Sequence, residues 1–92
     1  MVGLICNSDK HYHVVLDYYK KFLDNKINAQ IIYIGTLSKK IKNADKIKCM
    51  FVVVLGDNEI ENGVLQIKNL KTGDQRQVKF EDAVEIISKN ND

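Results

Sequence analysis

The chain has 92 residues, of which 45% are hydrophobic and 28% are charged, and its formal net charge is +2. This length and composition predict one globular domain, residues 1–92, with a single modest core, and they exclude a disordered, low-complexity or membrane-spanning chain. Because the net charge is small, it does not by itself indicate a nucleic-acid partner, and the positions of the charged residues are more informative than their sum. The two cysteines, with no basic leader before the first apolar segment, favour reduced thiols and a cytoplasmic location.

The first third of the chain is predicted to form a strand, a helix and a second strand. Residues 2–6 and 29–34 are rich in apolar and β-branched side chains, which is typical of strands. Asn7, Ser8 and Asp9 can cap the helix between them. Six apolar residues recur at helical spacing and predict its buried face: Tyr12, Val15, Leu16, Tyr19, Phe22 and Leu23.

A second helix pattern follows, and Thr36 or Ser38 can cap it. Residues three and seven apart share one face of a helix, and on the outward face of this one they are lysines: Lys39, Lys42 and Lys46. No acidic residue alternates with them at a spacing of four, so these charges are not neutralised locally. The pattern alone leaves two interpretations open, a solvated surface or a contact for a nucleic-acid backbone.

The rest of the chain predicts three strands and a closing helix. Residues 50–55 form an apolar run typical of a strand buried on both faces, followed by a polar turn with Gly56 and Glu59. Two further strands, joined by a turn, and a helix complete the predicted order: 64–70, 75–80 and 81–90. Short right-handed crossovers make the first three strands parallel with the first in the middle, and the last two extend the sheet as a hairpin.

Catalytic and metal sites are not predicted. His11 and His13 project about 200° apart if both lie on the first helix, so they cannot hold one metal ion, and we expect both to be solvated. No nucleophile stands with a histidine and a carboxylate in a recognisable pattern, and no repeated glycines form a phosphate-binding loop. A small-ligand module remains possible on topology alone, if a closed pocket lies at the strand ends.

Several short motifs together carry a family resemblance. They occur in this order: Ala44-Asp45-Lys46, the apolar strand, Gly56 with Glu59, Asn62-Gly63, the alternating strand with Lys68, and Thr72-Gly73-Asp74-Gln75. The series resembles the C-terminal anticodon-binding domain of class II aminoacyl-tRNA synthetases, and it is most similar to the domain of the histidine enzymes. The threonine, proline and glycine enzymes tend to have arginine in place of Lys68 and lack the continuation after it.

The resemblance implies a fold and a set of site residues. The fold is α/β in three α/β/α layers, with a five-stranded mixed sheet of order 2-1-3-4-5, an antiparallel fourth strand and three helices. Glu59 and Lys68 are expected to contact RNA bases, and the three lysines of the second helix to contact the RNA backbone. A carboxylate repels phosphate but accepts hydrogen bonds from base N–H groups, so Glu59 would serve discrimination rather than affinity. Lys68 lacks the planar fork of arginine.

The resemblance also implies partners. The expected partner is the anticodon stem-loop of histidine tRNA, with no DNA or membrane, and the expected context is a histidine–tRNA ligase that functions in translation. The catalytic domain of that family, which uses ATP and Mg²⁺, is separate, so no cofactor is expected on this chain. The whole enzyme is expected to be a homodimer and the isolated domain a monomer. The alternative is a free-standing RNA-binding or protein-docking module that reuses the fold.

Overall fold

The computed structural model describes residues 1–6, 11–32 and 36–89, apart from the side chain of Leu37. Within these residues the elements are β1 Val2–Cys6, α1 Tyr12–Asp24, β2 Ala29–Ile32, α2 Leu37–Lys46, β3 Phe51–Leu55, α3 Asp57–Glu61, β4 Leu65–Asn69, β5 Gln75–Val78 and α4 Phe80–Lys89. The strands lie where the sequence predicts them, within one or two residues at each described end. The predicted cap at Asn7, Ser8 and Asp9, and the predicted ends at residues 34 and 90, lie outside the described residues.

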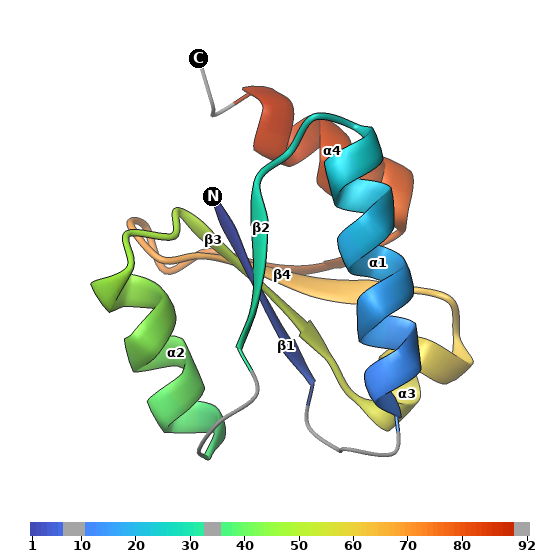
Figure 1. Ribbon diagram of the computed structural model, residues 1–92, viewed down its shortest axis with the longest axis horizontal. Coiled ribbons are helices and arrows are strands. Elements are labelled where there is room, and N and C mark those ends of the chain that lie inside the picture. The colour runs from blue at the N-terminus through green and yellow to red at the C-terminus, as the bar shows by residue number, and fades with distance from the viewer. Residues whose placement is uncertain (7–10, 33–35, 90–92) are drawn as a thin grey trace.

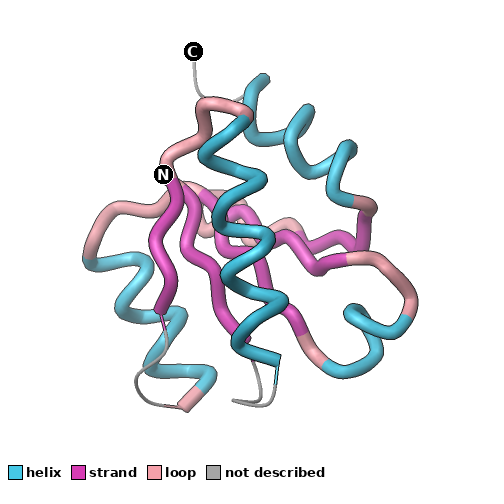
Figure 2. The backbone as a smooth tube through the Cα atoms, turned by 45° about the vertical axis from the view of Figure 1, so that its right-hand side comes forward, coloured by secondary structure: helices cyan, strands magenta, loops and turns pink. Residues whose placement is uncertain are grey.

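The five strands form one mixed sheet in the order β2-β1-β3-β4-β5 (Figure 1). Strand β1, the middle one of the three parallel strands, pairs with β2 and β3, whereas β4 runs antiparallel to both β3 and β5. Helices α1 and α4 cover one face of the sheet and α2 covers the other, as Figures 1 and 2 show from two sides. The predicted three-layer α/β/α fold and strand order are confirmed.

The number of helices was predicted wrongly. The described residues form four helices rather than three, because the expected polar turn after β3 contains the short helix α3. Gly56 precedes it in an extended conformation, and the acidic residues Asp57 and Glu59 occupy its first turn, where the helix dipole favours negative charge. Five residues are too few to show a helical period, so hydrophobic patterning could not reveal this helix.

The buried face of α1 also differs from the prediction. Val15 and Phe22 are buried, but three residues of the expected core stripe are exposed: Tyr12 by 41%, Leu16 by 36% and Leu23 by 43%. The rings of Tyr18 and Phe22 lie 5.8 and 5.0 Å from the ring of Phe80 in α4. The buried face of α1 is therefore the one that carries Val15, Tyr18 and Phe22, and Leu16 lies outside this face.

Helix α2 packs closely on β1, and of the two residues predicted to cap its start, Thr36 is the one that does so. The backbone N–H of Lys39 donates to Oγ1 of Thr36 over 3.3 Å. A Cβ atom at Gly3 would lie 3.1 Å from Cδ1 of Ile32 and 3.2 Å from Cβ of Ala44. Glycine at position 3 therefore lets α2 lie against the sheet at this short distance.

Candidate nucleic-acid interface

The three lysines of the predicted basic stripe, Lys39, Lys42 and Lys46, are all exposed on α2. Ala44 is buried and Ile41 half-buried on the inward side of the same helix, which turns the lysines away from the sheet. The ion pairs between described residues that involve carboxylates are His11–Asp57 and Glu85–Lys89, and neither includes these lysines. The stripe is thus available to an external anion.

Lys40, next to the stripe, has a different role that the sequence did not reveal. It is 9% exposed, and its Nζ donates a hydrogen bond to the carbonyl oxygen of Cys6 over 3.0 Å. Because Cys6 is the last residue of β1, this bond joins the first turn of α2 to the carboxyl end of β1. The spacing of four between Lys40 and the buried Ala44 is the one sequence signal that places Lys40 on the inward side.

Glu59 lies on α3, directly after the carboxyl end of β3. It is half-buried, and its backbone carbonyl accepts a hydrogen bond from the N–H of Val64 over 2.9 Å. Ile60, the next residue, packs against the core under α1 and α4. Glu59 is therefore held on a helix rather than on the polar turn that the sequence predicted.

Lys68 lies on β4, opposite Val52 on β3 and Gln75 on β5. Paired side chains share a face of the sheet, and Val52 belongs to the cluster of buried residues on the α2 side. Lys68 therefore faces the same side of the sheet as α2. Its neighbours there are amides, because Gln66 pairs with Gln77 on the same face. The opposite face of β4 is excluded from solvent, since Leu65 and Ile67 are buried in the core.

The structure does not bring Glu59 and Lys68 together. Val52 lies opposite Lys68 and four residues before Gly56, the N-cap of α3. Four residues of extended strand separate Val52 from Gly56 by about 13 Å. A ligand that meets both residues must therefore extend along the sheet, as a strand of nucleic acid does.

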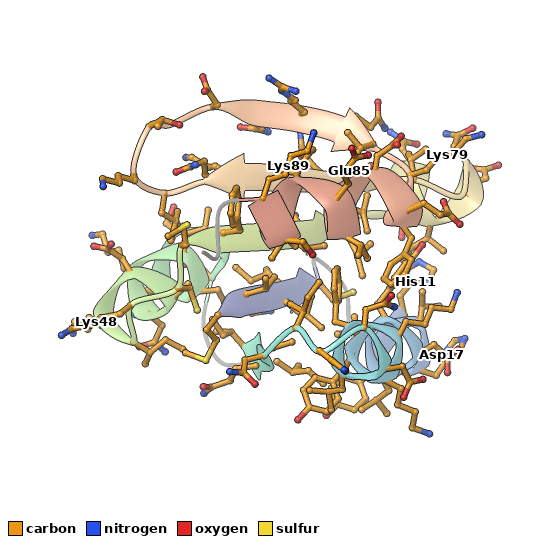
Figure 3. The ribbon with its side chains drawn as sticks, turned by 90° about the horizontal axis from the view of Figure 1, so that it is seen from above. His11, Asp17, Lys48, Lys79, Glu85 and Lys89 are labelled. Atoms are coloured by element: carbon orange, nitrogen blue, oxygen red, sulfur yellow. The ribbon has the colours of Figure 1, made fainter. Side chains whose placement is uncertain are left out.

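The helices give the two faces of the molecule opposite charge. Helix α2 carries four lysines and one aspartate, whereas α1 and α4 together carry five acidic residues and three lysines. Figure 3 shows these two layers, with Lys48 beyond the end of α2 on one side and Asp17 and Glu85 on the other. Attraction for a polyanion therefore favours the side of α2 and Lys68.

His11 departs from the predicted solvated state. Its Nε2 atom lies 2.5 Å from Oδ1 of Asp57 on α3, while His13 is exposed. Among the described residues, no group of three or more histidine, cysteine, aspartate or glutamate side chains is placed to hold a metal ion.

The structure offers little support for a small-ligand module. A cavity of about 390 Å³ lies beside α4, with Phe51, Ile67 and Ile86 among its lining residues. Phe51 begins β3, so this cavity lies at the other end of β3 from the carboxyl edge where open α/β sheets bind ligands. None of the helices in the described part of the chain is long and apolar enough to cross a membrane.

Comparison with known proteins decides the family. A family model described as an anticodon binding domain matches residues 1–90. The chain belongs to the anticodon-binding domain family. The histidine–tRNA ligase of Halothermothrix orenii is 25% identical to this anticodon-binding domain over 89 residues, which cover 96% of the chain and 21% of that protein. The ligase of Oceanobacillus iheyensis is 38% identical over 69 residues, which cover 74% of the chain and 16% of that protein.

Solved structures share the fold of the anticodon-binding domain. Histidyl-tRNA synthetase from a Nostoc species superposes with a TM-score of 0.90 at 24% identity, covering 96% of this chain and 21% of that one. The RNA binding domain of threonyl-tRNA synthetase from Cryptosporidium parvum superposes with a TM-score of 0.88 at 15% identity, covering 97% and 23%. The chain spans about a fifth of the length of these relatives. The family resemblance is confirmed, the accessory-module alternative is not favoured, and the roles of single residues stay predictions.

Proposed function

We propose that this anticodon-binding domain binds the anticodon stem-loop of histidine tRNA and contributes that binding to a histidine–tRNA ligase. Aminoacylation, with its ATP and Mg²⁺, belongs to a catalytic portion that this chain does not contain. The domain itself needs no cofactor and is a monomer, and the whole enzyme acts as a homodimer in the cytoplasm. The curated histidine–tRNA ligases that match this chain support the choice of tRNA.

The observation that carries the proposal is the basic face formed by α2 and Lys68. Lys39, Lys42 and Lys46 are exposed there, whereas the helices of the opposite face carry a net negative charge. Phosphate contacts supply affinity without reading sequence, largely through the release of counterions. We assign that task to the three lysines.

Glu59 and Lys68 have the complementary task of reading bases. The carboxylate of Glu59 accepts hydrogen bonds from base N–H groups and repels phosphate, so it distinguishes bases at the expense of affinity. Lys68 presents a single ammonium group on the solvent-accessible face of β4, among glutamine side chains. It therefore contributes one hydrogen-bonding contact to a base rather than the bidentate contact that an arginine makes.

Two variants separate these tasks in a binding assay with histidine tRNA and the same tRNA with an altered anticodon, across a series of salt concentrations. Lys→Gln at positions 39, 42 and 46 should weaken binding to both RNAs. It should also reduce the salt slope, the dependence of the logarithm of the binding constant on the logarithm of salt concentration, by about 2, because each of three phosphate contacts contributes roughly 0.7. Glu59→Gln should keep or raise affinity for the altered tRNA while the preference for the matched one falls by about 1 to 3 kcal/mol.

A matched control removes the same charge from the opposite face. Lys→Gln at positions 20, 79 and 89 changes three exposed lysines on or beside α1 and α4, and it should leave the salt slope nearly unchanged. If both triple variants change the slope equally, binding is not directed to the α2 face. If the unaltered chain binds both tRNAs equally, the domain does not read the anticodon.

A further inference from the structure

A contact between the ends of two helices carries an inference beyond base recognition itself. His11 is the N-cap residue of α1, yet its side chain makes no capping hydrogen bond to that helix. Its Nε2 instead lies 2.5 Å from Oδ1 of Asp57, the first residue of α3 and 46 positions further along the chain. The His11 side chain is 22% exposed and that of Asp57 is 62% exposed. The start of α1 and the start of α3 are thus joined at one end of the sheet (Figure 1).

Helix α3 has few features of its own that fix its orientation. It has five residues, none of them buried, and its N-cap, Gly56, has no side chain with which to cap it. A helix this short is unstable without tertiary contacts. Its backbone bonds, from the N–H of Ile60 to Gly56 and from the N–H of Asn62 to Asn58, fix its shape but not its direction.

Helix α1, in contrast, is firmly held. It has 13 residues, and the side chains of Val15 and Phe22 are fully buried in the core. Ile60 provides one apolar contact between α3 and the same core. The contact of His11 with Asp57 adds a second, polar point of attachment at the other end of α3, and two points define a direction where one does not.

The direction of α3 decides where Glu59 points. Residues two apart on a helix project about 200° apart. A contact that draws Asp57 toward α1 therefore turns Glu59 away from α1. We propose that His11 is a positioning residue: through Asp57 it sets the orientation of α3, and through that orientation it sets the anticodon preference that Glu59 provides. The last step rests on the proposed function, whereas the first does not.

Hydrogen exchange tests the first step without RNA. Backbone amide exchange is compared at one fixed pH in the unaltered chain, His11→Ala, His11→Gln and the control His13→Ala. His11→Ala should speed exchange of the Ile60 and Asn62 amides about three- to tenfold, the worth of a net hydrogen bond, and leave the amides of β3 unchanged. His11→Gln, which keeps an N–H donor, should restore most of the protection. His13→Ala should have no effect. Unchanged exchange of Ile60 and Asn62 in His11→Ala would overturn the proposal.

Binding of matched and altered tRNA tests the second step. His11→Ala should reduce the preference for the matched anticodon at least threefold, and His11→Gln should recover it. In a Glu59→Gln background, His11→Ala should cause no further loss, because the two residues act on the same discrimination. An unchanged preference in His11→Ala, or losses that simply add, would refute the role of His11. If the unaltered chain shows no preference, the proposed function fails, and the exchange experiment still decides whether His11 positions α3.

Discussion

Gly3→Ala is the sharpest test of how closely α2 lies on the sheet. The added Cβ would meet Cδ1 of Ile32 at 3.1 Å, Cβ of Ala44 at 3.2 Å and Sγ of Cys49 at 3.5 Å. The Ile32 methyl group ends a flexible side chain and can rotate away. The Ala44 methyl group has no such freedom, because it is fixed to the backbone of α2. The helix must therefore move by a few tenths of an ångström.

The expected cost follows from these contacts. Overpacking a core costs about 1 to 3 kcal/mol, and the smaller conformational entropy of alanine in the unfolded chain offsets about 0.4 to 1 kcal/mol of it. We expect a net loss of about 1 to 2 kcal/mol in the free energy of unfolding. In a domain of this size the loss lowers the thermal midpoint by roughly 5 to 15 °C, measured by circular dichroism.

A second substitution distinguishes the close contact from other causes. Ala44→Gly removes the opposing methyl group and by itself costs about 1 kcal/mol of helix propensity. Combined with Gly3→Ala it restores the space, so the double variant should lose less free energy of unfolding than the sum of the losses in the two single variants. If Gly3→Ala is neutral, or if the two effects simply add, α2 does not pack against β1 as closely as described.

Three further predictions follow from single residues. Leu16→Ala should cost less than about 1 kcal/mol because Leu16 is 36% exposed, whereas Phe22→Ala should cost about 3 to 5 kcal/mol; chemical denaturation compares them, and equal costs would contradict the described face of α1. Lys48 has a φ of 64°, so Lys48→Gly should raise the unfolding free energy by about 0.5 to 1 kcal/mol by the same measurement; a loss would contradict that conformation. Burial, together with the negative charge of Glu81, raises the pKa of Tyr18 above its ordinary value of about 10. The stability that Tyr18 contributes is therefore complete below pH 10 and is lost as the pH rises through the higher folded-state pKa; Tyr18→Phe should reduce this alkaline loss in a pH series of unfolding midpoints.

Elements with strong local sequence signals were predicted correctly. Features that depend on contacts between residues far apart in the sequence were not predicted. The apolar run of β3 and the N-cap of α2 depend on neighbouring residues alone; the strand was predicted correctly, and Thr36 is one of the two residues predicted for the cap. Helix α1 was predicted, but its buried face was not, because apolar residues occupy most of its circumference. The ring of Phe80, 58 positions beyond Phe22, selects the face that is buried.

The candidate site shows the same division. Exposure of Lys39, Lys42 and Lys46 followed from helical spacing, since residues three and seven apart share a face. The contact of His11 with Asp57 did not follow, because 46 residues separate them and α3 has no periodic pattern. The role of Lys40 was missed as well, since a lysine carries no mark of burial until the carbonyl oxygen of Cys6 is seen to accept its hydrogen bond.

The two unlike faces of β4 limit how the length of this domain can change. Leu65 and Ile67 lie in the core, while Gln66 and Lys68 lie on the face shared with α2. One residue inserted within β4 would reverse this alternation, carrying Lys68 into the core and Ile67 into water, whereas two would restore it. Insertions in the turn after Leu70 avoid this reversal, because the turn lies beyond the paired residues. Length variation among relatives of this chain should therefore gather in the turn and occur within β4 only in steps of two.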